Sequence, residues 1–135
     1  MLTLILGGVR SGKSRMAERL AAGFSGQIVY LATAETKDVE MQERIALHQT
    51  HRPEHWKTIE EPIHLAKALS EHGTAENVVI VDCLTLWITN LLLADERFKT
   101  GRDEIEALIT ELKRERRNLV LVSNETNSAW YPWTH

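Results

Sequence analysis

The residues with the clearest chemical potential form one run near the start of the chain. The run reads Gly7-Gly8-Val9-Arg10-Ser11-Gly12-Lys13-Ser14 and fits the phosphate-binding pattern G-x-x-x-x-G-K-[ST]. Backbone N–H groups of such a loop and the N-terminus of the following helix attract phosphate, while a chance glycine-rich turn is the alternative. Lys13 is expected to reach the terminal phosphates, and the Ser14 hydroxyl to bind Mg²⁺. The run therefore predicts binding of a nucleoside triphosphate.

Asp82 is a second residue whose type and position suggest nucleotide chemistry. It follows four apolar residues, Val78-Val79-Ile80-Val81, which are typical of a buried strand. Ligands bind at the carboxyl ends of strands in an open parallel sheet, so Asp82 is expected near Lys13 and beside Mg²⁺. Strands also end in Asp because this residue favours turns, so the signal depends on the phosphate-binding run.

Three of the six histidines lie close together, at His48, His51 and His55, with Arg52 between them. Neutral imidazole can attack an electron-poor phosphorus while arginine neutralises phosphate charge. The alternatives are a polar surface turn and a metal site, although a partner Cys or an HExxH spacing is lacking. His48 also falls on the apolar side of a predicted helix, and the pattern alone favours a packing role for it.

The elements that must position these groups follow from alternating apolar runs and helical patterns. Near-continuous apolar runs predict strands at residues 2–6, 27–32, 78–82 and 119–123. Apolar residues at helical spacing predict helices at residues 15–24, 40–50, 63–70 and 103–117. Pro62 favours the start of the third helix, and Asp103 is the expected N-cap of the fourth. This alternation predicts an α/β domain with a mostly parallel sheet.

Composition excludes several classes of protein. The chain has 135 residues, of which 43% are hydrophobic and 26% charged, as in an ordinary globular domain. A formal net charge of −3 does not indicate nucleic-acid binding, and no apolar run approaches the roughly 18 residues of a membrane span. Cys83 is the single cysteine, so an internal disulfide is excluded and a cytoplasmic location is expected.

Further motifs run in order through the first 125 residues. They are G-G-x-R-S-G-K-S at 7–14, Y-L-A-T-A at 30–34, E-M-x-x-R-I-x-x-H at 40–48, R-P-x-x-W at 52–56, T-I-E-E-P at 58–62, V-D-C-L-T-L-W at 81–87, T-N-L-L at 89–92 and V-S-N-E at 122–125. On these motifs the chain resembles the bifunctional adenosylcobinamide kinase / adenosylcobinamide-phosphate guanylyltransferase family of cobalamin biosynthesis. The resemblance implies a P-loop NTPase-like three-layer fold and a homo-oligomer.

The resemblance also implies two linked reactions and their residues. ATP or GTP would phosphorylate adenosylcobinamide, and GMP would then pass from GTP to adenosylcobinamide phosphate through a GMP–histidine intermediate on His48. Mg²⁺ would bridge phosphates near Ser14 and Asp82. Glu60 would accept hydrogen bonds from guanine. Besides the P-loop, the implied nucleotide-binding residues are Ala32, Thr33, Ala34, Gln49, Thr50, His51, Arg52, Glu60 and Asp82.

The motifs of the family stop at Glu125. We therefore expect an incomplete kinase/guanylyltransferase domain at residues 1–125, missing its C-terminal strands, and a tail at residues 126–135 that lies outside the family. A frameshift near codons 125–128 would explain such a tail, and it would leave a sheet edge and apolar surface uncovered. Two alternative functions follow: an inactive nucleotide-binding fragment, or a P-loop kinase for another small alcohol.

Overall fold

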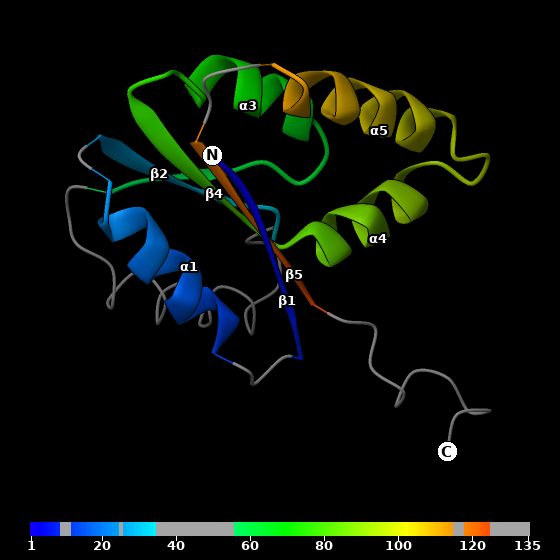
Figure 1. Ribbon diagram of the computed structural model, residues 1–135. Helices are drawn as coiled ribbons and strands as arrows, with labels where there is room; N and C mark the ends of the chain where they lie inside the picture. The colour runs from blue at the N-terminus through cyan, green and yellow to red at the C-terminus, as the bar shows by residue number, and fades with distance from the viewer. Residues whose placement is uncertain (9–11, 25, 35–55, 115–117, 125–135) are drawn as a thin grey trace.

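The described strands form one parallel sheet at the centre of the molecule (Figure 1). The computed structural model describes residues 1–8, 12–24, 26–34, 56–114 and 118–124, and for Ser14 and Asn124 the backbone only. The strands are β1 (Leu2–Gly7), β2 (Gln27–Ala32), β3 (Lys57–Glu60), β4 (Asn77–Asp82) and β5 (Asn118–Asn124). They lie in the order β1-β5-β4-β2-β3, and each neighbouring pair is parallel.

Helices cover both faces of this sheet, which makes three layers. They are α1 (Lys13–Ala22), α3 (Leu65–His72), α4 (Leu84–Ala94) and α5 (Lys99–Leu112). Figure 1 shows α1 on one face, where it contacts β1, β4 and β5. The other three helices lie on the opposite face, where α3 and α4 pack on the sheet and α5 packs against both of them. No described helix has the length and apolar character needed to cross a membrane.

Strand β4 explains why the apolar runs of this sequence are nearly continuous. Val78 and Ile80 belong to the core beneath α1, whereas Val79 and Val81 belong to the core beneath α3, α4 and α5. Both faces of the strand are buried, so each of these side chains contributes roughly 1.5–3 kcal/mol of transfer free energy. The predicted α/β class and parallel sheet are therefore confirmed.

The four predicted strands are confirmed, with shifts of one residue at some ends. All three helix starts that fall on described residues differ from the prediction, and the first helix, α1, begins at Lys13 instead of residue 15. Helix α3 begins at Leu65 instead of residue 63, because the Glu61 carboxylate accepts hydrogen bonds from the backbone N–H groups of Ile63 (3.1 Å) and His64 (3.0 Å) and holds a turn there. The predicted helix at residues 40–50 lies outside the described residues.

Helix α5 begins at Lys99, four residues before the predicted cap Asp103. The capping carboxylate is that of Asp95, which accepts hydrogen bonds from the N–H groups of Arg97 (3.0 Å), Lys99 (3.1 Å) and Thr100 (3.2 Å). These donors include free N–H groups of the first helical turn, which need such acceptors. Asp103 instead lies exposed inside the helix, so its predicted role as the cap is wrong.

Two elements were not predicted from the sequence, β3 and α4. The strand β3 has only four residues, and its weak signal is the pair Thr58-Ile59, both β-branched. Helix α4 is apolar on most sides, so it shows little of the amphipathic pattern by which surface helices are recognised. Strand β3 carries Glu60, one of the predicted nucleotide-binding residues, and α4 carries Asn90.

Candidate functional site

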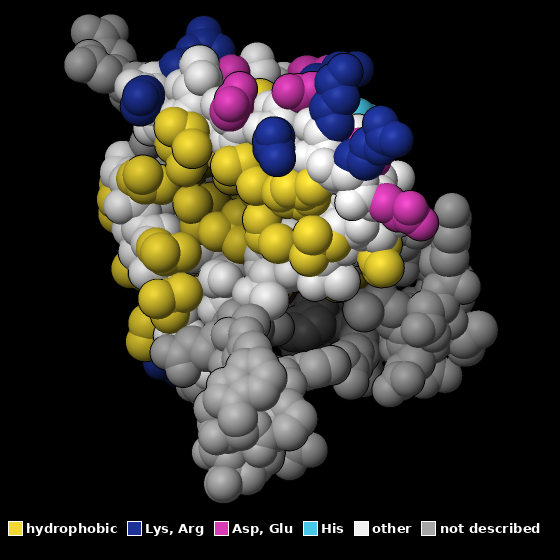
Figure 2. Space-filling view, turned by 90° about the vertical axis from the view of Figure 1, so that its right-hand side faces the viewer, with side chains coloured by type: hydrophobic (Ala, Val, Ile, Leu, Met, Phe, Trp, Pro, Cys, Tyr) yellow, Lys and Arg dark blue, Asp and Glu magenta, His cyan; other side chains and the backbone are white. Residues whose placement is uncertain are grey.

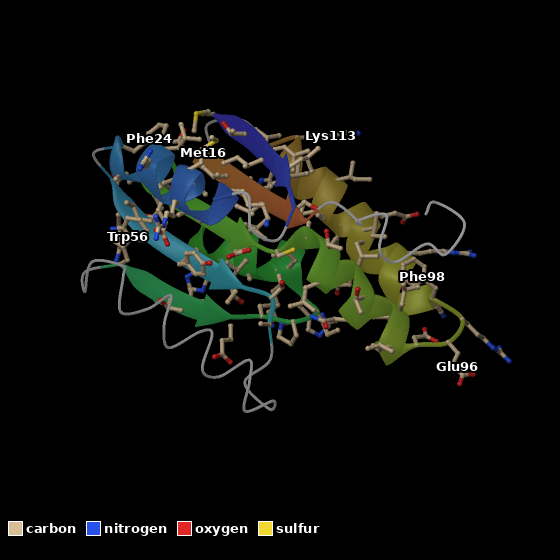
Figure 3. All side chains as sticks on the ribbon, turned by 90° about the horizontal axis from the view of Figure 1, so that it is seen from below. Met16, Phe24, Trp56, Glu96, Phe98 and Lys113 are labelled. Atoms are coloured by element: carbon tan, nitrogen blue, oxygen red, sulfur yellow. The ribbon has the colours of Figure 1, made fainter. Side chains whose placement is uncertain are left out.

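The candidate site lies at the edge of the sheet where the strands end, which we call the carboxyl edge. Pairing across the sheet aligns five residues in one row: Ile5 of β1, Val122 of β5, Asp82 of β4, Ala32 of β2 and Glu60 of β3. Strands β1 and β5 run toward the lower side of Figure 1, and Figure 3 shows the molecule from that side. The parallel topology thus brings together candidate residues from distant parts of the sequence.

The phosphate-binding run joins β1 to α1 at this edge. Gly7 ends the strand, Lys13 begins the helix, and Gly12 between them has φ 77°. This left-handed conformation is costly for any residue with a Cβ atom, which accounts for glycine at this position of the motif. The Gly12 carbonyl accepts a hydrogen bond from the N–H of Met16 (3.1 Å), as the residue before a helix should.

Lys13 is held over the loop. Its side chain is only 7% exposed, and the ammonium group donates a hydrogen bond to the carbonyl oxygen of Gly8 (2.9 Å). The charge of Lys13 therefore lies against the backbone of the phosphate-binding run. Residues 9–11 of the run lie outside the described residues, and Ser14 is described by its backbone alone, as the second residue of α1.

Asp82 ends β4 and is partly buried. Its Oδ2 atom accepts a hydrogen bond from the hydroxyl of Tyr30, a buried residue of β2. Tyr30 was not among the predicted site residues. Its signal in the sequence is a hydroxyl at the end of an aromatic side chain within an apolar strand, since buried tyrosine hydroxyls usually have a partner.

Thr33 connects the ends of β2 and β4. Its buried hydroxyl donates to the carbonyl oxygen of Cys83 (2.7 Å) and accepts from the N–H of the same residue (2.9 Å). The Thr33 N–H also donates to the Asp82 carbonyl (3.0 Å). Ala32 and Ala34 beside it are buried as well. Thr33 therefore links the backbone after β2 to the backbone at the end of β4. The structure brings Ala32, Thr33 and Asp82 together.

Glu60 is the last residue of β3, which is the outermost strand on the side of the sheet opposite β1, and it is exposed. The next residue, Glu61, donates its N–H to the carbonyl of Ala32 (2.9 Å), which extends the β2–β3 pairing beyond the strand. Four inter-strand spacings separate β3 from β1, or roughly 19 Å. Glu60 and the phosphate-binding run thus lie at the same carboxyl edge, but on the two outermost strands of the sheet. The predicted site residues His48, Gln49, Thr50, His51 and Arg52 lie outside the described residues.

The donor chemistry of this edge suits Mg²⁺. Magnesium prefers oxygen ligands and is usually held by one or two carboxylates together with substrate phosphates. Asp82 supplies a carboxylate at the same edge of the sheet as the phosphate-binding run, two strands away from β1, and Ser14 has the residue type of the second protein ligand in this motif. Among the described residues, His, Cys, Asp and Glu side chains form no group of three or more that could hold a metal ion by themselves.

A hollow of about 540 Å³ lies at the opposite edge of the sheet. Its lining includes the first residues of three strands, Gln27, Asn77 and Asn118. Ligands of open parallel sheets bind at the carboxyl ends of the strands, and the phosphate-binding run is at that end. The amino-edge hollow is therefore not the candidate nucleotide site.

Comparison with known proteins identifies the family. The cobinamide kinase / cobinamide phosphate guanyltransferase family, CobU, matches residues 3–135. The bifunctional adenosylcobalamin biosynthesis protein CobP of Pseudomonas aeruginosa is 50% identical over 132 residues, which are 98% of this chain and 76% of that protein. The corresponding CobU proteins of Escherichia coli and Salmonella typhimurium are 38% and 36% identical, each over 98% of this chain and 79% of the relative. The chain belongs to the cobinamide kinase / cobinamide phosphate guanyltransferase family.

Proposed function

We propose that this chain phosphorylates adenosylcobinamide with ATP or GTP and then transfers GMP from GTP to adenosylcobinamide phosphate. The observation that supports this most is the presence of a complete phosphate-binding motif at the carboxyl edge of a parallel sheet, in a chain half identical to a bifunctional relative. The single cysteine is in keeping with a cytoplasmic location, and the resemblance to the family suggests a homo-oligomer.

In the kinase step, the hydroxyl oxygen of adenosylcobinamide attacks the γ-phosphorus, its proton passes to solvent water, and a nucleoside diphosphate leaves. The loop N–H groups and the Lys13 ammonium orient the triphosphate and balance its charge. Mg²⁺, held near Ser14 and Asp82, would neutralise charge on the phosphate oxygens. The hydrogen bond between Tyr30 and Asp82 fixes the carboxylate before the nucleotide binds.

In the guanylyl step, a ring nitrogen of His48 attacks the α-phosphorus of GTP and pyrophosphate leaves. A phosphate oxygen of adenosylcobinamide phosphate then attacks the same phosphorus, forming adenosylcobinamide-GDP and releasing His48. Arg52 lies four residues after His48 and can balance phosphate charge. Glu60 can accept hydrogen bonds from guanine N1–H and the exocyclic amine, which favours GTP over ATP.

The test is covalent labelling with α-labelled GTP and Mg²⁺. We expect an acid-labile label on the protein, because a phosphorus–nitrogen bond to histidine breaks in acid. The variant His48→Asn should carry no label. The matched variant His55→Asn, from the same histidine cluster but outside the implied nucleotide-binding residues, should be labelled like the parent.

The same assay separates the competing functions. GTP binding without any label on the parent would favour an inactive nucleotide-binding fragment. ATP turnover with a small alcohol, again without label, would favour a kinase of different specificity. Label on both variants would refute the role of His48.

The two reactions attack different phosphorus atoms, so one nucleotide pose does not serve both. We propose that the nucleotide or the His48 segment shifts between the steps within one shared site. GTP affinity at the P-loop should then fall once the protein carries GMP. Unchanged affinity in the GMP-charged protein would rule out a single shared site.

A further inference from the structure

Asn90 of α4 makes an unusual pair of contacts with the carboxyl edge. Its side-chain nitrogen donates to the carbonyl oxygen of Thr33 (2.8 Å) and to the carbonyl oxygen of Pro62 (3.1 Å). These carbonyls come from two different segments, which follow β2 and β3 respectively. One amide group therefore joins two strand ends that are far apart in the sequence.

The chemistry of the amide allows only one orientation. Both neighbours are carbonyl oxygens and can only accept, so the nitrogen with its two hydrogens must face them. A carboxylate of the same shape would place an oxygen against two oxygens. The two hydrogen bonds therefore require the amide donor of asparagine, and a side chain of the same size without that donor cannot replace it.

The two joined segments carry candidate groups for nucleotide recognition. Thr33 itself lies between the strand ends of β2 and β4, and Pro62 is two residues beyond Glu60. Helix α4 holds the second segment at another point, because Trp87 donates its indole N–H to the carbonyl of Ile63 (2.7 Å). Trp87 is buried in the core, so α4 is a firm support for both contacts.

We propose that Asn90 is a positioning residue for guanine recognition, because it fixes the segment that carries Glu60 relative to Thr33. This inference rests on the proposed role of Glu60 as the acceptor for guanine. A misplaced Glu60 would lose its hydrogen bond to the exocyclic amine of guanine. Asn90 does not touch the nucleotide in this proposal.

The experiment compares binding of GTP with binding of inosine triphosphate, which lacks that amine. We expect the parent to bind GTP roughly tenfold more tightly, as suits one hydrogen bond to a charged acceptor. Asn90→Ala should reduce this preference to below about threefold, and Asn90→Asp should reduce it similarly. If these variants do not fold, Asn90→Ser, whose hydroxyl can still donate one hydrogen bond, takes their place in the comparison.

Asn77 provides the matched control. Its side-chain nitrogen donates to the carbonyl of His72 (2.8 Å), the same kind of bond at the amino end of β4. Asn77→Ala should lower the melting temperature but leave the GTP preference unchanged. If Asn90→Ala likewise lowers only the melting temperature, Asn90 has a structural role alone and the inference is overturned.

Glu60→Ala, which removes the acceptor from an exposed side chain, distinguishes this inference from the proposed function. If this variant keeps the GTP preference, or if the parent shows none, guanine recognition by Glu60 is wrong and the inference falls with it. If Glu60→Ala loses the preference while both Asn90 variants keep it, only the positioning role of Asn90 is refuted. Loss of the preference in Glu60→Ala and both Asn90 variants, with the preference of Asn77→Ala unchanged, supports both proposals.

Discussion

Individual polar groups at the carboxyl edge already have partners within the protein. Lys13 contacts Gly8, Asp82 contacts Tyr30, and Thr33 contacts Cys83. Groups held in this way need little rearrangement when a charged ligand arrives, and such preorganisation is the main source of electrostatic stabilisation in enzymes. At the residue scale, each of these groups is therefore held by a neighbouring residue, and the three neighbours Gly8, Tyr30 and Cys83 all lie within the motifs of the family.

Gly12 allows a direct test of the loop backbone. Gly12→Ala should destabilise the protein by about 1–2 kcal/mol, because alanine is strained at a φ of 77°. The free energy of unfolding without nucleotide measures this. Gly8→Ala is the control: an added Cβ there meets no atom within 4 Å and Gly8 lacks the positive φ. Equal losses in the two variants would contradict the argument.

At the scale of elements, single carboxylates decide where two helices begin. Glu61 holds the turn before α3, and Asp95 accepts three N–H groups before and within the first turn of α5. Hydrogen bonds from the N–H of Thr100, and then from that of Arg97, lower the pKa of Asp95 below its ordinary value of 3.8. The folded state therefore favours the ionised form of Asp95.

This pKa shift predicts how stability depends on pH. A carboxyl with a lowered folded-state pKa stabilises the protein above pH 3.8, and that contribution is lost as the pH falls through the folded-state pKa. Asp95→Ala should therefore lower the melting temperature at pH 7, and the difference from the parent should shrink in acid. Asp103 is the cap predicted from the sequence, and Asp103→Ala should change the melting temperature little at either pH. The reverse ranking would restore Asp103 as the cap.

At the scale of the whole molecule, β1 is the edge strand of the described sheet and is unevenly covered. Leu2, Leu4 and Leu6 are more than half exposed on the face of α3, α4 and α5, whereas Ile5 is buried beneath α1. Figure 2 shows the right-hand side of Figure 1, where hydrophobic side chains gather in one broad area below charged ones. An open edge with apolar side chains favours association with other chains.

The alternation along β1 gives a paired prediction. Leu4→Glu changes a side chain that is 54% exposed, so it should cost about 1 kcal/mol or less and reduce self-association. Ile5→Glu places a charge where the side chain is 7% exposed, and it should abolish folding. Sedimentation velocity and thermal unfolding measure the two effects. If both variants had the same thermal stability and the same self-association, the two faces of β1 would not differ in burial as argued.

Local sequence patterns were enough to predict the phosphate-binding motif, the buried parallel strands and the family. Each of these depends on residues close together in the chain, such as a loop glycine or an apolar run. Tertiary structure alone decided the strand order, which places Asp82, Ala32 and Glu60 in one row, and the contacts of Asn90, made across 57 and 28 residues. It also decided that Asp95, and not Asp103, caps α5. Local patterns cannot specify such contacts, because they exist only once distant segments have packed together.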